Sequence, residues 1–123
     1  MARLLLVDDD RQLLDLYRLI LERAGHEVHT AETCSAARVR LQQSDPEVVV
    51  MDLRVPEMED GLALIRTLRG HKRPAGMPPL RVIVASGWTE DLPPGLEREA
   101  IDRVLAKPVR MQVLLRSIAE LGG

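Results

Sequence analysis

Four charged residues in this sequence follow runs of apolar residues. Asp8 and Asp9 come directly after LLLV, Asp52 after VVVM, and Lys107 after VLA. Three carboxylates gathered around one ammonium group are suited to a divalent cation and a phosphoryl group, because positive charge offsets the acids and the phosphate oxygens. The spacing predicts such a site if the fold brings the four residues together.

Magnesium is the cation that this set of residues favours. Two carboxylates about 4 Å apart repel by roughly 4 kcal/mol at an effective dielectric constant near 20, so three of them need a compensating cation. Mg²⁺ takes oxygen ligands, keeps several waters and typically uses one or two carboxylates together with phosphate oxygens. No cysteine or histidine adjoins the acids in the sequence, which disfavours zinc. With the metal bound, one carboxylate can act as the nucleophile toward a phosphoryl donor.

The elements that would position these residues alternate between strands and helices. Apolar runs predict strands at residues 3–7, 26–31, 47–51, 80–85 and 103–106. Helical spacing predicts helices at residues 13–24, 33–43, 62–68, 96–101 and 111–121. This order is typical of a doubly wound α/β domain, with a five-stranded parallel sheet and helices on both faces. Right-handed crossovers bring all the strand C-termini to one edge, so the acids should meet there.

Length and composition exclude several classes of protein. The chain has 123 residues, a net charge of −2 and 46% hydrophobic residues, which indicates one globular domain spanning residues 1–123. The absence of a basic stripe argues against direct binding of nucleic acid or an anionic membrane. No apolar stretch approaches the length of a membrane span. The single cysteine, Cys34, fits a reducing cytoplasm and rules out an internal disulfide.

Four segments together resemble the receiver domain of two-component response regulators. They are LLLVDDD (4–10), VVVMDLRVPEMEDG (48–61), VIVASG (82–87) and VLAKP (104–108). Each segment alone is weakly specific, whereas four in this order and spacing are strongly so. The resemblance implies a flavodoxin-like fold with strand order 2-1-3-4-5. The chemotaxis receiver is a known example of this order.

The resemblance also implies a role for each site residue. Asp52 is expected to accept a phosphoryl group from a histidine of a kinase or a histidine phosphotransfer protein. Mg²⁺ is expected to bind Asp9, Asp52, the backbone carbonyl of Arg54 and, through a water, Asp8. Ser86 and Lys107 are expected to contact the bound phosphate, and the peptide bond between Lys107 and Pro108 is expected to be cis.

Two features of the sequence depart from the receiver pattern. The position three before Lys107, usually aromatic in the family, is Val104, which has no ring to move between buried and exposed states. Pro56 and Gly61 stand one residue further apart than usual. Arg54 and Trp88, two residues after Asp52 and Ser86, are expected to limit access of water to the phosphate.

Simpler roles exist for several of these residues. Acidic residues at the start of a helix can serve only as caps, and this is the expected role of Asp10. Lys107 alone would be an ordinary surface lysine, and a serine such as Ser86 is often a turn residue. His26 and His29 are expected to be solvated.

The leading functional hypothesis is a Mg²⁺-dependent phosphoacceptor domain in the cytoplasm. It would not be an enzyme in the ordinary sense, apart from catalysis of its own phosphorylation and dephosphorylation. It would signal through a protein partner or an attached output domain, and could form a phosphorylation-dependent dimer. One alternative is a receiver-like interaction scaffold that is not phosphorylated. Another is a small aspartyl-phosphate phosphatase, for which Asp8 and Asp10 formally supply an Asp-x-Asp motif.

Overall fold

Five parallel strands form one sheet at the centre of the computed structural model, which describes residues 2–52, 58–71, 73–87 and 101–122. The strands are β1 (Arg3–Val7), β2 (Glu27–Ala31), β3 (Val48–Asp52), β4 (Arg81–Ser86) and β5 (Arg103–Ala106). Their order is β2-β1-β3-β4-β5, which confirms the predicted flavodoxin-like arrangement. The described part of the chain also contains four helices: α1 (Arg11–Arg23), α2 (Cys34–Ser44), α3 (Met58–Gly70) and α4 (Met111–Gly122).

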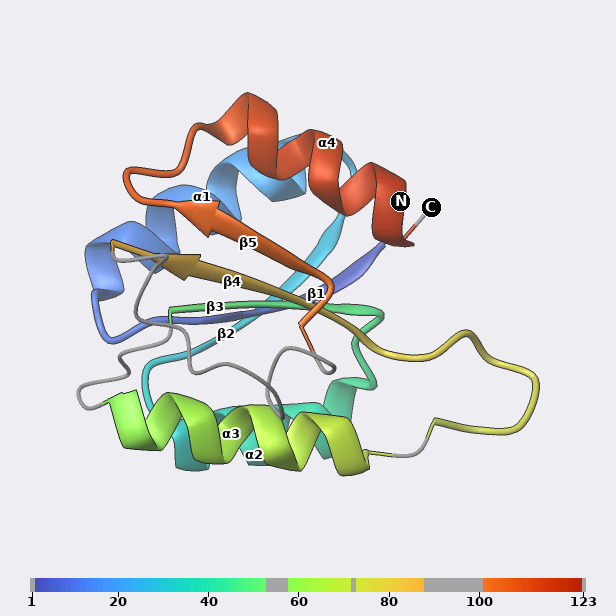
Figure 1. Ribbon diagram of the computed structural model, residues 1–123. Coiled ribbons are helices and arrows are strands. Elements are labelled where there is room, and N and C mark those ends of the chain that lie inside the picture. The colour runs from blue at the N-terminus through green and yellow to red at the C-terminus, as the bar shows by residue number, and fades with distance from the viewer. Residues whose placement is uncertain (1, 53–57, 72, 88–100, 123) are drawn as a thin grey trace.

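The helices cover both faces of the sheet. Helices α1 and α4 lie on one face, and α2 and α3 lie on the other (Figure 1). All four neighbouring strand pairs are parallel, so their C-terminal ends lie at one edge of the sheet. We call this the carboxyl edge and the opposite one the amino edge. None of the described helices is long and apolar enough to cross a bilayer.

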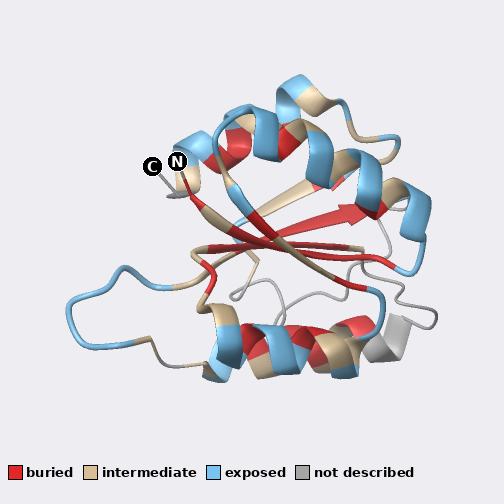
Figure 2. Cartoon of the chain, turned by 180° about the vertical axis from the view of Figure 1, so that it is seen from behind, coloured by how far each residue is buried: buried red, intermediate tan, exposed pale blue. Residues whose placement is uncertain are grey.

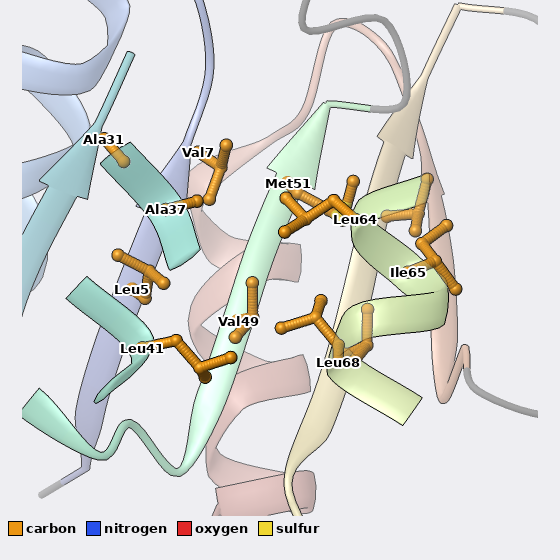
Figure 3. Close-up of a cluster of buried hydrophobic side chains, with 12 residues drawn as sticks. Leu5, Val7, Ala31, Ala37, Leu41, Val49, Met51, Leu64, Ile65 and Leu68 are labelled. Atoms are coloured by element: carbon orange, nitrogen blue, oxygen red, sulfur yellow. The ribbon is translucent and has the colours of Figure 1, made fainter. Parts of the chain in front are cut away.

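Alternate residues of the central strands fill two separate hydrophobic cores. In β1, Leu5 and Val7 face the core shared with α2 and α3, whereas Leu4 and Leu6 face the core shared with α1 and α4. Figure 3 shows the first core, in which Val49 of β3 lies between side chains from the two helices. Because these strands are covered on both faces, they are apolar at nearly every position.

The exposure of the strands confirms which ones are central. Strands β1, β3 and β4 are buried along most of their length, and Figure 2 shows them as the red centre of the domain. Strand β2 lies at the end of the sheet and has two buried residues, Val28 and Ala31. The alternating sequence of β2 is therefore explained by its position.

Element boundaries differ from the predicted ones by at most two residues, except that α3 begins at Met58, four residues before the predicted start. Strands β3 and β4 each extend one residue beyond the predicted apolar run, because Asp52 and Ser86 pair in the ladder with Ala85 and Ala106. Helix α2 begins after Thr33, whose hydroxyl accepts a hydrogen bond from the backbone N–H of Ala36. The predicted helix at 96–101 lies outside the described residues, apart from its last position.

The two histidines near β2 are partly exposed, so the prediction that they are solvated holds only in part. Both are half-buried. The Nδ1 atom of His26 accepts the backbone N–H of Ala2 at 2.9 Å, and His29 Nε2 lies 3.1 Å from an oxygen of Glu27. The sequence pattern placed them on an edge strand but did not show that the chain start covers His26.

Candidate phosphoryl and metal site

The carboxyl edge of the sheet brings the three predicted acidic residues together. Strands β1 and β3 are adjacent, and their register pairs Val7 with Met51, so Asp8 and Asp52 follow at neighbouring positions. One carboxylate oxygen from each of Asp8, Asp9 and Asp52 lies within 4.8 Å of the others. Asp8 and Asp52 are 44 residues apart in sequence, and the parallel pairing of β1 with β3 explains why they meet.

Adjacent acids at the end of β1 have different environments. Asp8 is buried, with 8% of its surface exposed. Its Oδ1 accepts the backbone N–H of Asp10 at 2.9 Å, which fixes the carboxylate at the start of α1. Asp9 is exposed. Asp10 caps α1 by accepting the backbone N–H of Leu13 at 3.2 Å, which confirms the capping role expected for it.

Lys107 supplies the ammonium group of the site. Its Nζ atom lies 2.7 Å from Oδ2 of Asp52 and 3.6 Å from Oδ2 of Asp8. The end of β5 positions this lysine, since Ala106 pairs with Ser86 and the backbone N–H of Lys107 donates to the carbonyl of Ser86 at 3.0 Å. The following bond to Pro108 is cis, as expected.

Burial and charge shift the pKa values of two of these groups in the same direction. Burial raises the pKa of Asp8, and the charge of Asp52 adds to this, although the Asp10 hydrogen bond and Lys107 oppose it. Burial alone would lower the pKa of Lys107, but its hydrogen bond to Asp52 and the charges of Asp52 and Asp8 outweigh burial and raise it. The lysine therefore stays protonated within the acidic cluster.

Ser86 ends β4 on the strand next to Asp52. It is buried, with 6% of its surface exposed, and comes one position after Ala85, the ladder partner of Asp52. The structure thus brings Ser86 to the same edge as the acids and Lys107. Arg54 lies outside the described residues, and so do Pro56 and Trp88.

Tyr17 also lies at the site, which the sequence did not suggest. A cavity of about 20 Å³, enough for one water molecule, is lined by Tyr17, Asp8, Asp52 and Lys107 together with apolar residues. Burial raises the pKa of Tyr17, the charge of Lys107 opposes this shift, and that of Asp8 adds to it. Tyr17 lies in the helix predicted at residues 13–24, but the helical spacing did not reveal these neighbours.

The set of donor atoms suits a magnesium ion. Three carboxylates carry more negative charge than the single Lys107 ammonium offsets, and oxygen atoms of all three lie close enough to share one cation. Among the described residues this cluster contains no sulfur or imidazole donor, as expected for a hard cation.

The doubly wound parallel sheet, with an acidic cluster and a lysine at its carboxyl edge, is the arrangement of a known class of signalling domains. The family model for the response regulator receiver domain matches residues 4–119. The chain therefore belongs to the receiver family of two-component response regulators, which are signalling domains rather than enzymes in the ordinary sense.

The curated relatives are transcriptional regulators. The chain is 36% identical over 118 residues to the transcriptional regulatory protein GltR of Pseudomonas aeruginosa, covering 96% of this chain and 48% of that protein. It is 31% identical to the virulence transcriptional regulatory protein PhoP of Salmonella typhimurium, covering 94% of this chain and 53% of the relative. The chain thus spans about half the length of these two relatives.

Solved receiver structures share the fold over nearly the whole chain. A receiver domain from Bermanella marisrubri is 30% identical, with a TM-score of 0.78 and coverage of 97% of this chain and 96% of that one. The response regulator TrrA of Thermotoga maritima, solved in complex with Mg²⁺ and BeF, is 24% identical and has a TM-score of 0.78. The match covers 98% of this chain and 99% of the TrrA chain.

Proposed function

We propose that this chain is a phosphoacceptor domain and that Asp52 receives the phosphoryl group from a histidine of a kinase or a histidine phosphotransfer protein. The observation that carries the proposal is the position of the Lys107 ammonium, 2.7 Å from Asp52, with Asp8 and Asp9 in the same cluster. Asp52 makes the shorter of the two carboxylate contacts to the Lys107 ammonium, which fits a nucleophile in a transfer that requires the charge on the phosphoryl group to be offset.

In the proposed reaction, a carboxylate oxygen of Asp52 attacks the phosphorus atom of phosphohistidine. A P–O bond forms, the P–N bond breaks, and the imidazole keeps the electron pair and takes up a proton. Lys107 pairs with the Asp52 carboxylate before transfer and then with an oxygen of the phosphoryl group. The hydroxyl of Ser86, at the end of the neighbouring strand, contacts another phosphoryl oxygen.

The proposed metal ligands are Asp9, Asp52 and the backbone carbonyl of Arg54, with Asp8 acting through a water. Bound Mg²⁺ would neutralise charge on the phosphoryl oxygens as the transfer proceeds. Asp8 is held in place by its hydrogen bond from Asp10, so it is suited to orient a metal-bound water.

The phosphorylated domain would signal in the cytoplasm through a protein partner or an attached output domain. The relatives that are transcriptional regulators, each about twice as long, support the second route. A phosphorylation-dependent dimer remains compatible with either.

Val104 is half-buried against the core of α2 and α3. Its lack of a ring implies that any conformational response runs without the rotation of an aromatic side chain at this position.

The phosphatase alternative is weakened by the position of Asp10. That reaction needs the first and third acids of the Asp-x-Asp motif in the site, whereas the Asp10 side chain caps α1. The scaffold alternative predicts that the intact acidic cluster does not accept a phosphoryl group, so one experiment separates it from the proposal.

The test is incubation with acetyl phosphate and Mg²⁺, followed by intact mass measurement. We expect one added phosphoryl group in the wild type, none in Asp52→Asn, and none when the metal is chelated. Asp10→Asn is the matched control, because asparagine also caps helices and should leave the added mass unchanged. An unmodified wild type under these conditions, or an Asp52→Asn variant that still gains the mass, would contradict the proposal.

A further inference from the structure

The cavity beside the acidic cluster connects helix α1 to the carboxyl edge of the sheet. It measures about 20 Å³, and its lining comes from α1, from the ends of β1, β3 and β4, and from the segment that follows β5. Leu13 and Tyr17 both line it, since residues four apart lie on the same face of a helix. Tyr17 is therefore part of the surroundings of Asp52 and Lys107.

Polar groups in the lining make this cavity suitable for a water molecule. Asp8, Asp52 and Lys107 contribute charged groups, and Tyr17 is the only uncharged polar side chain among the described residues that line the cavity. A buried water needs a space of roughly 10–15 Å³ or more and about two to four polar partners. The cavity meets both conditions for one water.

The Lys107 ammonium has a donor that its carboxylate partners do not use. An ammonium group carries three N–H groups. One donates to Asp52 at 2.7 Å, whereas the contact with Asp8, at 3.6 Å, is longer than an ordinary hydrogen bond. No other carboxylate of the described residues lies within ion-pair distance of this ammonium. At least one N–H group is therefore left for an uncharged acceptor such as water.

The hydroxyl of Tyr17 is close enough to Lys107 and Asp8 to respond to both charges. Burial raises the pKa of Tyr17, the charge of Lys107 opposes this shift, and the charge of Asp8 adds to it. The phenol therefore keeps its proton at neutral pH. A neutral hydroxyl can accept one hydrogen bond and donate another, so it can bind a water that also contacts a cation.

The two side chains differ in how firmly the protein holds them. Tyr17 is half-buried, and its ring packs against the core shared with α1 and α4, which restricts the position of its hydroxyl. Lys107 ends a flexible four-carbon stem, and its side chain is 31% exposed. The ammonium is therefore the group that gains from a restraint, and the tyrosine is the group able to supply one.

We infer that Tyr17 is a positioning residue for phosphoryl transfer: one water held in the cavity links its hydroxyl to the Lys107 ammonium and keeps that ammonium directed at Asp52. The inference rests on the proposed phosphoacceptor function and adds a residue of α1 to it. Tyr17 acts through Lys107 and makes no contact of its own with the phosphoryl group.

The first test is a double-mutant cycle on the rate of phosphorylation by acetyl phosphate and Mg²⁺. Tyr17→Phe removes the hydroxyl and keeps the ring, and it should slow the reaction about fivefold, the effect of one net hydrogen bond. In a Lys107→Ala background the same change should have no effect, because the group that Tyr17 positions is gone. Thr30→Val is the matched control, since it removes a hydroxyl from β2 that does not line the cavity, and it should leave the rate unchanged.

The second test is the NMR signal of the Lys107 ammonium in the unphosphorylated chain. The chain has two lysines, Lys72 and Lys107, so a Lys72→Arg variant assigns the signal. We expect the ammonium protons of Lys107 to exchange with solvent about fivefold faster in Tyr17→Phe than in the wild type, because one hydrogen bond that protects them is lost. Thr30→Val should leave their exchange unchanged.

The outcomes separate this inference from the proposed function. A wild type that gains no phosphoryl group would overturn both. A phosphorylated wild type with an equal rate in Tyr17→Phe would overturn the role of Tyr17 alone. An equal fall in rate in the wild-type and Lys107→Ala backgrounds would assign Tyr17 a packing role and overturn the inference, as would ammonium exchange that is the same with and without the hydroxyl.

Discussion

At the carboxyl edge of the sheet three carboxylates surround one ammonium, whereas at the amino edge carboxylates and arginines pair one to one. Asp8 and Asp52 both contact Lys107, and Asp9 lies in the same acidic cluster. At the other edge, Arg73 pairs with Asp45 at 3.2 Å and Arg81 with Asp102 at 3.1 Å.

The difference separates two uses of charge on the same sheet. Paired charges at the amino edge satisfy one another, and Asp102 also accepts the backbone N–H of Val82 at 2.7 Å, so they secure the strand starts and the loop. Unbalanced charges at the carboxyl edge repel, which makes the site ready for a metal and a phosphoryl group. Substitutions at the carboxyl edge should therefore alter chemistry, and substitutions at the amino edge should alter stability.

The largest expected effect is that of Lys107→Ala on the reaction. Removing the ammonium takes away a group that offsets charge on the transferred phosphoryl, so the rate of phosphorylation by acetyl phosphate should fall by about 100-fold or more. The same change removes a competitor for the carboxylates, so Mg²⁺ should bind more tightly in calorimetry. Loss of both phosphorylation and Mg²⁺ binding in this variant would indicate damage to the fold. An unchanged rate of phosphorylation would remove Lys107 from the mechanism.

An intermediate effect is expected for Asp45→Asn at the amino edge. Asparagine tolerates the positive φ of 45° at this position but carries no charge, so the nearly buried Arg73 loses its counter-ion. We expect a loss of about 2 kcal/mol in the free energy of unfolding by urea, with the phosphorylation rate unchanged. Arg103→Gln is the control, since it breaks an exposed pair with Glu120 and should cost less than about 0.5 kcal/mol. Equal losses in the two variants would show that burial of Arg73 does not matter.

The smallest effect concerns the pH dependence of stability through His26. Burial lowers the pKa of His26, so the unfolded chain takes up a proton at higher pH than the folded chain does. The contribution of His26 to folding stability should therefore be fully present above the unfolded pKa of 6.5. It should be lost as the pH falls from that value through the lower pKa of the folded state. His26→Asn can keep an acceptor for Ala2 without titrating, and it should flatten this part of the urea stability profile. A profile of the same slope in the variant would assign the pH dependence to other groups.

The order of strands and the acids of the site were predictable because they depend on local patterns. Continuous apolar runs such as 48–51 mark central strands, and a charged residue at the end of each run must lie at the edge where parallel strands end. The roles of Asp52 and Lys107 required the family resemblance as well. An acid that follows an apolar run can be placed at the carboxyl edge, but this position does not show which carboxylate reacts.

Tertiary structure alone decided which charged groups pair and which adjacent acids are buried. Asp8 and Asp9 are neighbours in sequence, yet the hydrogen bond from Asp10 accompanies burial of the first while the second is exposed. The pairing of Arg73 with Asp45 depends on how a loop folds back over a helix end 28 residues earlier. Apolar periodicity is a local property that is visible in the sequence. Contacts between charged side chains depend on crossover geometry and on the paths of loops, which no local sequence pattern encodes.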